Sequence, residues 1–356
     1  MTPAWRQALL SHRALLVLAV IYSVAVLAEA MYCGVPAHEV FHALRYAGIF
    51  LLTISIFAAG IYAGTYFGIM LVERRNAWTA VPILEERAGR YFSSADFTYA
   101  CMGALVLLGN SFFLISKSLI NVINPLHRLK WDFYFSAWDK FLHAGHYPHD
   151  LLLPAINAIS AGRVLDFLYF FWLNAIFLLT LYNLFGDKMP HRRLRFLWVY
   201  FLSWVLLGSL AATVFNSVGP LFYHSFYPET PDVYAAVGQN IDTLQKQAFT
   251  FAGMTRVLLL RWQGNDAMID ANAISAMPSM HVAIAWLAVL YAREINRCFF
   301  YLVLLFFVCI LIGSVYLGFH YAIDGYVSVI AVSMIWWIMG KVIDRHFTRV
   351  EKLGDA

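Results

Sequence analysis

Long runs of apolar residues recur along the chain, and they constrain its fold more than any other feature of the sequence. A run of about 20 apolar residues can cross a bilayer as a helix, and a spanning helix satisfies its own backbone hydrogen bonds. We expect eight spans, the sixth of them short: Ala14–Ala30, Ala47–Leu71, Phe97–Ser116, Leu165–Phe185, Phe196–Phe215, Met280–Tyr291, Cys298–Phe319 and Tyr321–Ile343. The sequence therefore predicts an all-α, multi-pass transmembrane helical bundle.

Composition agrees with a membrane protein. Hydrophobic residues make up 61% of the chain and charged residues 13%, with a mean hydropathy of +0.66, whereas soluble domains hold about 25% charged residues. Arg6 and Arg13 precede the first span as they would in a signal peptide, but no convincing cleavage site follows, so we expect a retained helix. The cysteines lie in or beside the spans, which indicates packing and not a disulfide framework or a metal site; they are Cys33, Cys101, Cys298 and Cys309.

The distribution of positive charge predicts the orientation. If all eight spans cross, most of the 25 Lys and Arg residues fall on the side of the N-terminus, so both termini are expected to be cytoplasmic. Lys117, His281 and His320 then share the extracytoplasmic face. In a membrane protein the net charge of +4 does not indicate a nucleic-acid partner.

Two outer segments have patterns of their own. Residues Trp131–His143 read as an amphipathic helix lying in the interface, with Trp131, Tyr134, Trp138 and Phe141 on one stripe and Asp132, Ser136, Asp139, Lys140 and His143 on the other. The polar segment Ser217–Ala276 is long enough to cap the bundle. We expect one membrane domain over residues 1–356, with two extra spans in 1–96 and the core in 97–343.

Two short motifs next to spans carry the candidate chemistry. Ionisable groups at the edge of a bilayer are costly and persist mainly where they function. In the string from His320 to Asp324, a His and an Asp four residues apart lie on one helical face. Asp324 can therefore accept the N–H of His320, which leaves the other ring nitrogen able to attack an electrophile.

The second motif is Pro278-Ser279-Met280-His281. Pro278 suits the first turn of a helix, and Ser279 with the exposed N–H groups there makes an anion site. His281, one turn in, could protonate a leaving oxygen. Each motif alone is common in proteins without such a role, and Lys117 alone would be an interfacial anchor. Together they favour phosphoryl over acyl chemistry, because no serine or cysteine nucleophile is paired with a base.

These residues resemble the motifs of the type 2 phosphatidic acid phosphatase superfamily of membrane lipid phosphatases and phosphotransferases. The first motif, Lys-x6-Arg-Pro, reads Lys117 to Asn124-Pro125, with Asn124 in place of arginine. The second, Pro-Ser-Gly-His, has Met280 in place of glycine. The third, Ser-Arg-x5-His-x3-Asp, begins Gly313-Ser314 and ends at His320 and Asp324. The resemblance covers roughly residues 97–339.

The resemblance implies a role for each matched residue. His320 would be the nucleophile, Asp324 its orienting partner, and His281 the acid that releases the alcohol and then the base that activates the acceptor. Lys117 and Ser279 would hold phosphate oxygens, and Asn124 and Ser314 occupy the positions of the family's two arginines in the substrate site. The family uses no metal, and we expect no cofactor.

The missing arginines favour a phosphodiester donor. Arginine suits the doubly charged oxygens of a monoester, whereas a diester carries one charge fewer. The third-motif arginine is also lacking in the branch that resembles inositol phosphorylceramide synthases, and the segments Phe135–Gly145 and Gly219–Tyr223 look like that branch. We expect transfer of a headgroup from a phospholipid to a lipid or sugar hydroxyl. A lipid phosphatase acting on phosphatidic acid-like or polyprenyl phosphates is the alternative, and a transporter with a histidine proton relay the second.

A histidine-rich stretch in an outer loop offers a weaker candidate. His143, His146, His149 and Asp150 have spacing that a metal could use. The neighbouring Tyr147-Pro148 pair favours a solvated turn instead.

Overall fold

The computed structural model describes residues 3–36, 62–74, 76–126, 130–262 and 274–354, with isolated positions between 37 and 61. These residues form helices joined by turns and loops, with no strand among them. In chain order the helices are α1 (Pro3–Tyr32), α3 (Ala77–Phe92), α4 (Ala95–Asn110), α5 (Phe113–Ile123), α7 (Trp131–Leu142), α8 (Pro148–Ala158), α9 (Gly162–Leu181), α10 (Pro190–Ser203), α11 (Ala212–Val214), α12 (Tyr223–Phe226), α13 (Ala235–Gln247), α14 (Phe251–Trp262), α15 (Met280–Arg293), α16 (Arg297–Tyr316) and α17 (Ala322–Gly354). Two π-helical segments, η1 (Tyr182–Gly186) and η2 (Trp204–Ala211), and the 3-10 turn η3 (Pro220–Phe222) complete them.

The predicted membrane bundle is confirmed. Within the described residues six helical segments are long and apolar enough to cross a membrane, at Leu9–Tyr32, Ala95–Ile123, Gly162–Gly186, Pro190–Val214, Arg297–Tyr316 and Ala322–Arg345. They match six of the eight expected spans. The short sixth span is α15. Of the second, Ala47–Leu71, the C-terminal part lies in the apolar helix Tyr62–Val72, and most of residues 47–61 lie outside the described part of the chain.

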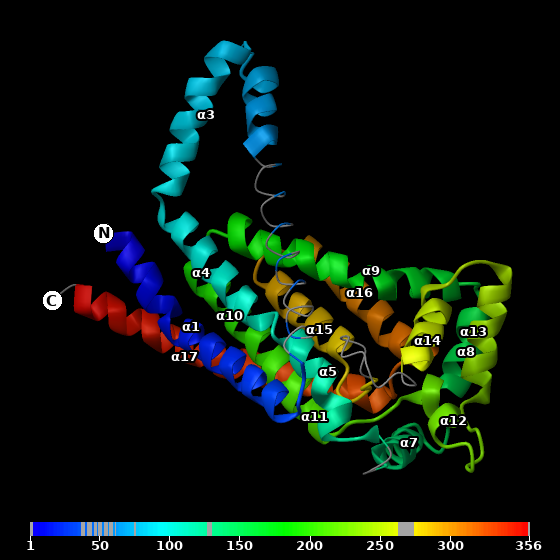
Figure 1. The fold of residues 1–356 in the computed structure, drawn as a ribbon. Coiled ribbons are helices and arrows are strands. Elements are labelled where there is room, and N and C mark those ends of the chain that lie inside the picture. The colour runs from blue at the N-terminus through cyan, green and yellow to red at the C-terminus, as the bar shows by residue number, and fades with distance from the viewer. Residues whose placement is uncertain are drawn as a thin grey trace.

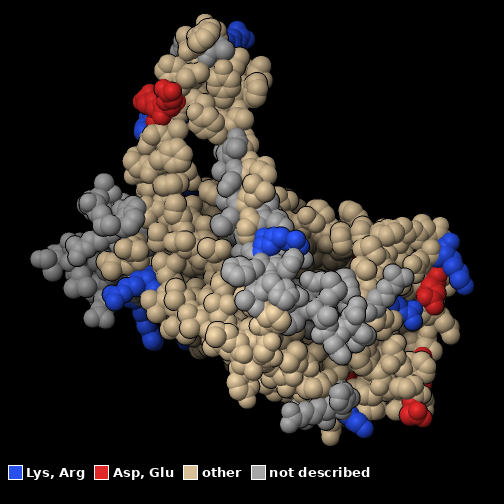
Figure 2. Space-filling view, viewed as in Figure 1, with Lys and Arg blue, Asp and Glu red and all other residues tan. Residues whose placement is uncertain are grey.

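The spans pack side by side, with the start of α1 and the end of α17 at one end of the bundle and α7, α12 and α13 at the other (Figure 1). α3 and the segment before it project away from the bundle. Among the described residues visible in Figure 2, charged side chains lie mostly toward the ends of the face, with one basic group near its centre. This distribution is the one expected of a protein whose middle contacts lipid.

α15 is the central helix of the bundle and is too short to cross a bilayer. It contacts α9, α10, α16 and α17, and its buried residues run from Val282 to Ala292. Its 14 residues rise only about 21 Å, against a hydrocarbon core of about 30 Å. α15 therefore cannot reach both edges of the hydrocarbon core, and its first turn carries His281.

A π-helical segment shapes the wall that faces this first turn. α10 continues into η2 and α11 as one span, and Trp204, Gly208 and Ala212 of this region line the cavity described below. π-helical turns widen a helix and often occur at functional sites.

The helix expected at Trp131–His143 forms as α7, and its polar stripe is more buried than its aromatic stripe. Its position at a membrane interface stays a prediction. Tyr134 and Phe141 of the aromatic stripe are 56% and 81% exposed, whereas Asp132 and Asp139 of the polar stripe are 0% and 2% exposed. The carboxylates bond other parts of the chain instead of water. The aromatic stripe thus faces outward, as aromatic side chains do at a membrane interface.

The expected outer segment, Ser217–Ala276, folds into η3, α12, α13 and α14 within its described part. The start of α14 is held by Asp166 of α9, whose carboxylate accepts the backbone N–H groups of Phe251 and Ala252, both at 2.8 Å. Because α14 also lines the cavity, this segment forms part of the site.

Candidate active site

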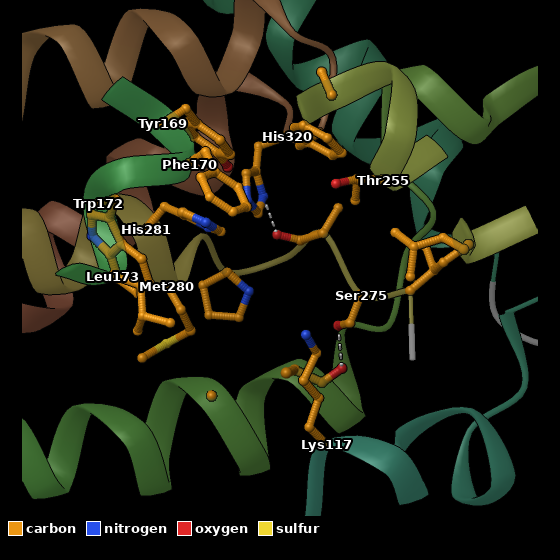
Figure 3. Close-up of a pocket in the computed structure, with 18 of the residues that line it drawn as sticks. Lys117, Tyr169, Phe170, Trp172, Leu173, Thr255, Ser275, Met280, His281 and His320 are labelled. Atoms are coloured by element: carbon orange, nitrogen blue, oxygen red, sulfur yellow. Dashed lines mark hydrogen bonds between the residues drawn. The ribbon is translucent and has the colours of Figure 1, made fainter. Parts of the chain in front are cut away.

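A cavity of about 380 Å³ opens between α5, α9, η2, α14, the start of α15 and the loop before α17. Lys117, His281 and His320, which lie far apart in the sequence, all line it (Figure 3). Most of the remaining wall is apolar; it includes Phe113, Phe170, Leu173, Trp204, Phe251 and Leu259. The cavity therefore combines a small polar centre with surface suited to hydrocarbon chains.

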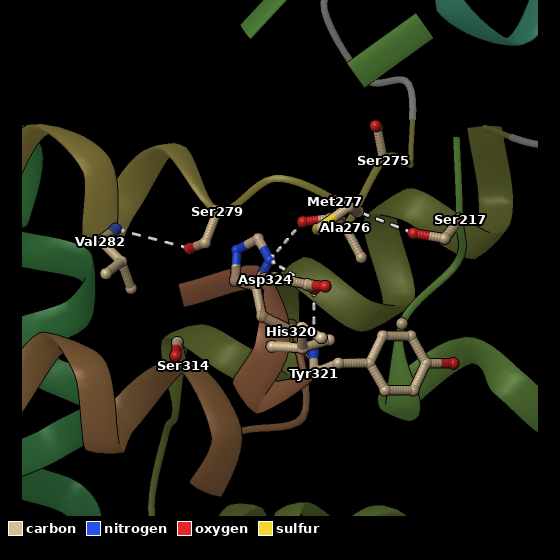
Figure 4. Close-up of polar contacts among 12 residues, drawn as sticks. Ser217, Ser275, Ala276, Met277, Ser279, Val282, Ser314, His320, Tyr321 and Asp324 are labelled. Atoms are coloured by element: carbon tan, nitrogen blue, oxygen red, sulfur yellow. Dashed lines mark hydrogen bonds and ion pairs between the residues drawn. The ribbon is translucent and has the colours of Figure 1, made fainter. Parts of the chain in front are cut away.

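His320 lies in the loop between α16 and α17, and a backbone carbonyl fixes its ring. Its Nδ1 atom lies 2.6 Å from the carbonyl oxygen of Ala276 (Figure 4). Because a carbonyl oxygen only accepts, Nδ1 carries the proton and donates it. The lone pair is then on Nε2, the atom that a nucleophilic histidine uses.

Asp324 lies behind His320, in the first turn of α17. Its Oδ2 atom is 3.5 Å from Nδ1 of His320 and accepts the backbone N–H of Tyr321 at 2.9 Å. Its Oδ1 atom is buried and has no hydrogen-bond partner within the described residues. The carboxylate that the sequence pairs with His320 is adjacent to it, but the shortest contact of Nδ1 is with Ala276.

His281 faces His320 across the cavity. The ring centroids are 6.0 Å apart. Tyr169 stacks on the imidazole of His281 at 4.2 Å, and the indole of Trp172 lies 4.4 Å from it. Among the described residues no hydrogen bond engages the ring of His281, so its nitrogens are available to a substrate.

Lys117 supplies the positive charge. It lies inside α5, six residues before the helix ends at Ile123, and its ammonium group points into the cavity (Figure 3). The described part of the chain provides no hydrogen bond or ion pair to this ammonium. Lys117 therefore lies within the span Ala95–Ile123, whereas the expected span Phe97–Ser116 ended just before it.

Three other residues expected in the substrate site lie outside the lining of the cavity. Ser279 is the N-cap of α15, and its buried hydroxyl accepts the N–H of Val282 at 3.4 Å. The amide of Asn124 donates to the carbonyl oxygen of Thr213 at 2.7 Å. The hydroxyl of Ser314 donates to the carbonyl oxygen of Leu311 at 2.7 Å. Their side chains bond the protein, and their contact with substrate stays a prediction.

Other residues of the site had no signal in the sequence. The carbonyl of Ala276 is a backbone group that any residue would supply. Tyr169 and Trp172 come from an apolar span and read as packing residues. The hydroxyl of Tyr169 and the indole N–H of Trp172 are buried without a hydrogen-bond partner in the described residues.

In the histidine-rich stretch, Nε2 of His149 lies 3.3 Å from Oδ1 of Asp150, while His143 contacts other residues. His143 lies 2.9 Å from the hydroxyl of Tyr326 through Nε2 and 2.7 Å from the carbonyl oxygen of Asp139 through Nδ1. His149 stacks near Tyr147 and Tyr234. No group of three His, Cys, Asp or Glu side chains in the described residues is placed to hold a metal ion.

The cavity thus brings together the imidazole of His320, the imidazole of His281 opposite it and the ammonium group of Lys117. Comparison with known proteins agrees with this geometry. The profile of the PAP2 superfamily matches residues 135–338, which is more than half of the 356 residues and contains both histidines. Comparisons with curated proteins and with solved structures give no match. The chain therefore belongs to the PAP2 superfamily, whose members act on lipid phosphates as phosphatases or phosphotransferases.

Proposed function

We propose that the protein is a lipid phosphotransferase that moves a phosphoryl headgroup from a phospholipid-type donor to a lipid or sugar hydroxyl through a phosphohistidine on His320. The single observation that carries the choice of a diester donor is the number of cationic side chains in the cavity. Lys117 is the only Lys or Arg among the described residues that line it. A phosphodiester carries one negative charge, which one ammonium group can balance, whereas a dianionic monoester is better matched by arginine forks.

In the first step Nε2 of His320 attacks phosphorus, a P–N bond forms, and the bond between phosphorus and the diacylglycerol oxygen breaks. His281 gives its proton to that oxygen. The Ala276 carbonyl and the Asp324 carboxylate stabilise the positive charge that develops on the ring of His320.

In the second step the acceptor hydroxyl gives its proton to His281 and attacks phosphorus, and the P–N bond breaks. Lys117 balances the charge on the phosphate oxygens throughout. The apolar wall formed by η2, α9 and α14 suits the hydrocarbon chains of donor and acceptor. The proposed acceptor is a sphingolipid-type alcohol, in line with the resemblance to the inositol phosphorylceramide synthase branch.

A lipid phosphatase is the second candidate, and membership of the PAP2 superfamily supports it. The same two histidines would serve, with water in place of the acceptor alcohol. The two reactions differ in donor charge and in acceptor, and the chemistry at His320 is common to both.

The proposed topology places both termini in the cytoplasm and the site on the extracytoplasmic side of a cell membrane. The distribution of Lys and Arg supports it, as does the position of α7 at the end of the bundle away from the termini (Figure 1). Residues 97–343 would form the catalytic core and 1–96 an addition to it.

The experiment that tests the proposal is mass spectrometry of the products made by the purified protein. The substrates are phosphatidic acid in one reaction and phosphatidylinositol in another, each with ceramide or diacylglycerol present. A new phosphodiester lipid, absent with His320→Ala, is the expected result. Free phosphate and diacylglycerol from phosphatidic acid, with no new phosphodiester lipid, would establish the phosphatase instead. No turnover in either reaction would overturn both.

A further inference from the structure

Helix α7 contacts the catalytic loop at several points, although the function described above assigns it no part. His320 lies in the loop of residues 317–321 between α16 and α17, so helical hydrogen bonding does not fix it. Its backbone N–H donates to the carbonyl oxygen of Ser314 at 3.2 Å. The precision of a nucleophile in such a loop depends on contacts from other parts of the chain.

Asp139 supplies two of these contacts. Its Oδ2 accepts the backbone N–H of Ala322 and its Oδ1 that of Ile323, both at 2.8 Å. These residues open α17, directly between His320 and Asp324. The carboxylate therefore satisfies two N–H groups that a helix start leaves unpaired, at the positive end of the helix dipole.

Asp132, two turns earlier on the same face of α7, binds the loop through the side chain of Tyr321. Its Oδ1 accepts the hydroxyl of Tyr321 at 2.8 Å, and Tyr321 follows His320 directly. The same carboxylate accepts the backbone N–H groups of Val218 and Gly219 at 3.0 Å. Asp132 thus joins the catalytic loop to the segment that precedes η3.

His143 extends this face by one further turn through its 2.9 Å contact with the hydroxyl of Tyr326 on α17. The residues that make these contacts, at positions 132, 139 and 143, lie on one side of α7 and its C-cap. The opposite side carries the exposed aromatic stripe. The polar side of α7 therefore binds the start of α17 at several positions.

We propose that α7 is a positioning element of the active site, in which the carboxylates of Asp139 and Asp132 fix the segment from His320 to Asp324. Neither carboxylate lines the cavity, so both act through the loop and not on the substrate. Loss of Asp139 frees the first turn of α17, and the orientation of His320 relative to phosphorus becomes less precise. A misplacement of about 1 Å can lower a rate by about 100-fold.

The test compares Asp139→Asn with the wild-type protein in the phosphoryl-transfer assay, and the proposal rests on the function proposed for His320. Asparagine keeps the size of the side chain but replaces one acceptor oxygen with an N–H₂ group that faces a donor. We expect kcat to fall by about 10- to 100-fold, with KM within about twofold of the wild-type value. Tyr321→Phe, which removes only the hydroxyl bound by Asp132, should lower kcat by a smaller factor.

Asp187→Asn is the matched control. Asp187 is a buried carboxylate that bonds Arg192 and the hydroxyl of Tyr291, and it lies beyond η1, near the other ends of α9 and α15. Its loss should lower the thermal midpoint without changing kcat of the folded protein. If Asp139→Asn and Tyr321→Phe retain wild-type kcat, or if KM rises in place of a fall in kcat, the proposal is wrong.

A second readout separates this proposal from the proposed function. Nitrogen NMR of histidine-labelled protein reports the tautomer of His320, assigned by comparison with His320→Ala. In wild type we expect the proton on Nδ1, and in Asp139→Asn a broadened or shifted signal. If the wild-type protein shows no turnover, the proposed function fails. The His320 signal then still tests whether α7 positions His320. An identical signal in Asp139→Asn would then overturn the role of α7.

Discussion

The Nδ1 atom of His320 donates its proton to the carbonyl oxygen of Ala276 over 2.6 Å. A backbone carbonyl thereby performs the task that a carboxylate performs in most His-Asp pairs, which is to select the tautomer. Asp324 lies 3.5 Å from the same atom, so its contribution is mainly the charge it places beside the ring. The two roles can be separated by substitution.

Asp324→Asn should lower kcat by about 10- to 100-fold, while His320→Ala removes activity. The tautomer persists because Ala276 still accepts the Nδ1 proton, and what is lost is stabilisation of the charged ring. Where a carboxylate alone fixes the tautomer, the same change costs about 10⁴-fold. Steady-state rates in detergent check this, with Asp242→Asn on the exposed face of α13 as control. A loss as large as that of His320→Ala would show that Asp324 sets the tautomer.

His281→Gln should lower kcat by about 10²- to 10⁴-fold with a lipid alcohol as the leaving group. The loss should be much smaller with a nitrophenyl phosphodiester, because nitrophenolate leaves without a proton. Parallel assays of the two substrates measure the difference. An equal loss on both would mean that His281 does not protonate the leaving oxygen and that its stacking with Tyr169 only shapes the cavity.

Gly219→Ala should destabilise the protein and impair the site. Gly219 has φ +79°, and a Cβ atom there would lie 2.6 Å from the carbonyl oxygen of Phe319, the residue before His320. Gly145 has φ +88° with nothing within 4 Å of such an atom, so Gly145→Ala costs only the left-handed strain, about 1–2 kcal/mol. The thermal midpoint should fall at least twice as far for Gly219→Ala. Equal shifts for the two variants would contradict the close approach.

The parts of this molecule that could be predicted from sequence are those set by the bilayer or by side-chain identity. Bilayer thickness makes a span recognisable as an apolar run, and the spans Arg297–Tyr316 and Ala322–Arg345 follow the predicted bounds closely. His281, His320 and Lys117 could be named because ionisable residues stand out in such runs, and the cavity brings the three together.

Other features could not be predicted, for physical reasons. The Ala276 carbonyl has no side-chain signature. The stripe of Asp132 and Asp139 has the same sequence pattern whether it faces water or buried backbone N–H groups. Ser279 fits both an anion site and a helix cap, and only the packing of α15 against α17 shows that its hydroxyl is enclosed.

The burial of Asp139 predicts a pH dependence of stability. Burial raises the pKa of Asp139 from 3.8 to about 6, although the N–H groups of Ala322 and Ile323 and the nearby His143 oppose the rise and Asp324 adds to it. In the unfolded chain the carboxyl loses its proton near its ordinary pKa, while in the folded protein it keeps the proton until about pH 6. The folded state therefore binds more protons between these values, and the free energy of unfolding falls as the pH rises through this window.

At about 1.4 kcal/mol for each unit of pKa difference, the fall between pH 4 and pH 6 is at most about 3 kcal/mol. Asp139→Asn has no such group, so its stability should change less over the same range. Unfolding of the two proteins in detergent at several pH values measures the difference, with Asp187→Asn again as the control for loss of a buried carboxylate. If the free energy of unfolding changes with pH equally in wild type and Asp139→Asn, Asp139 is ionised over the whole range. The N–H groups at the start of α17 would then always face a negative charge.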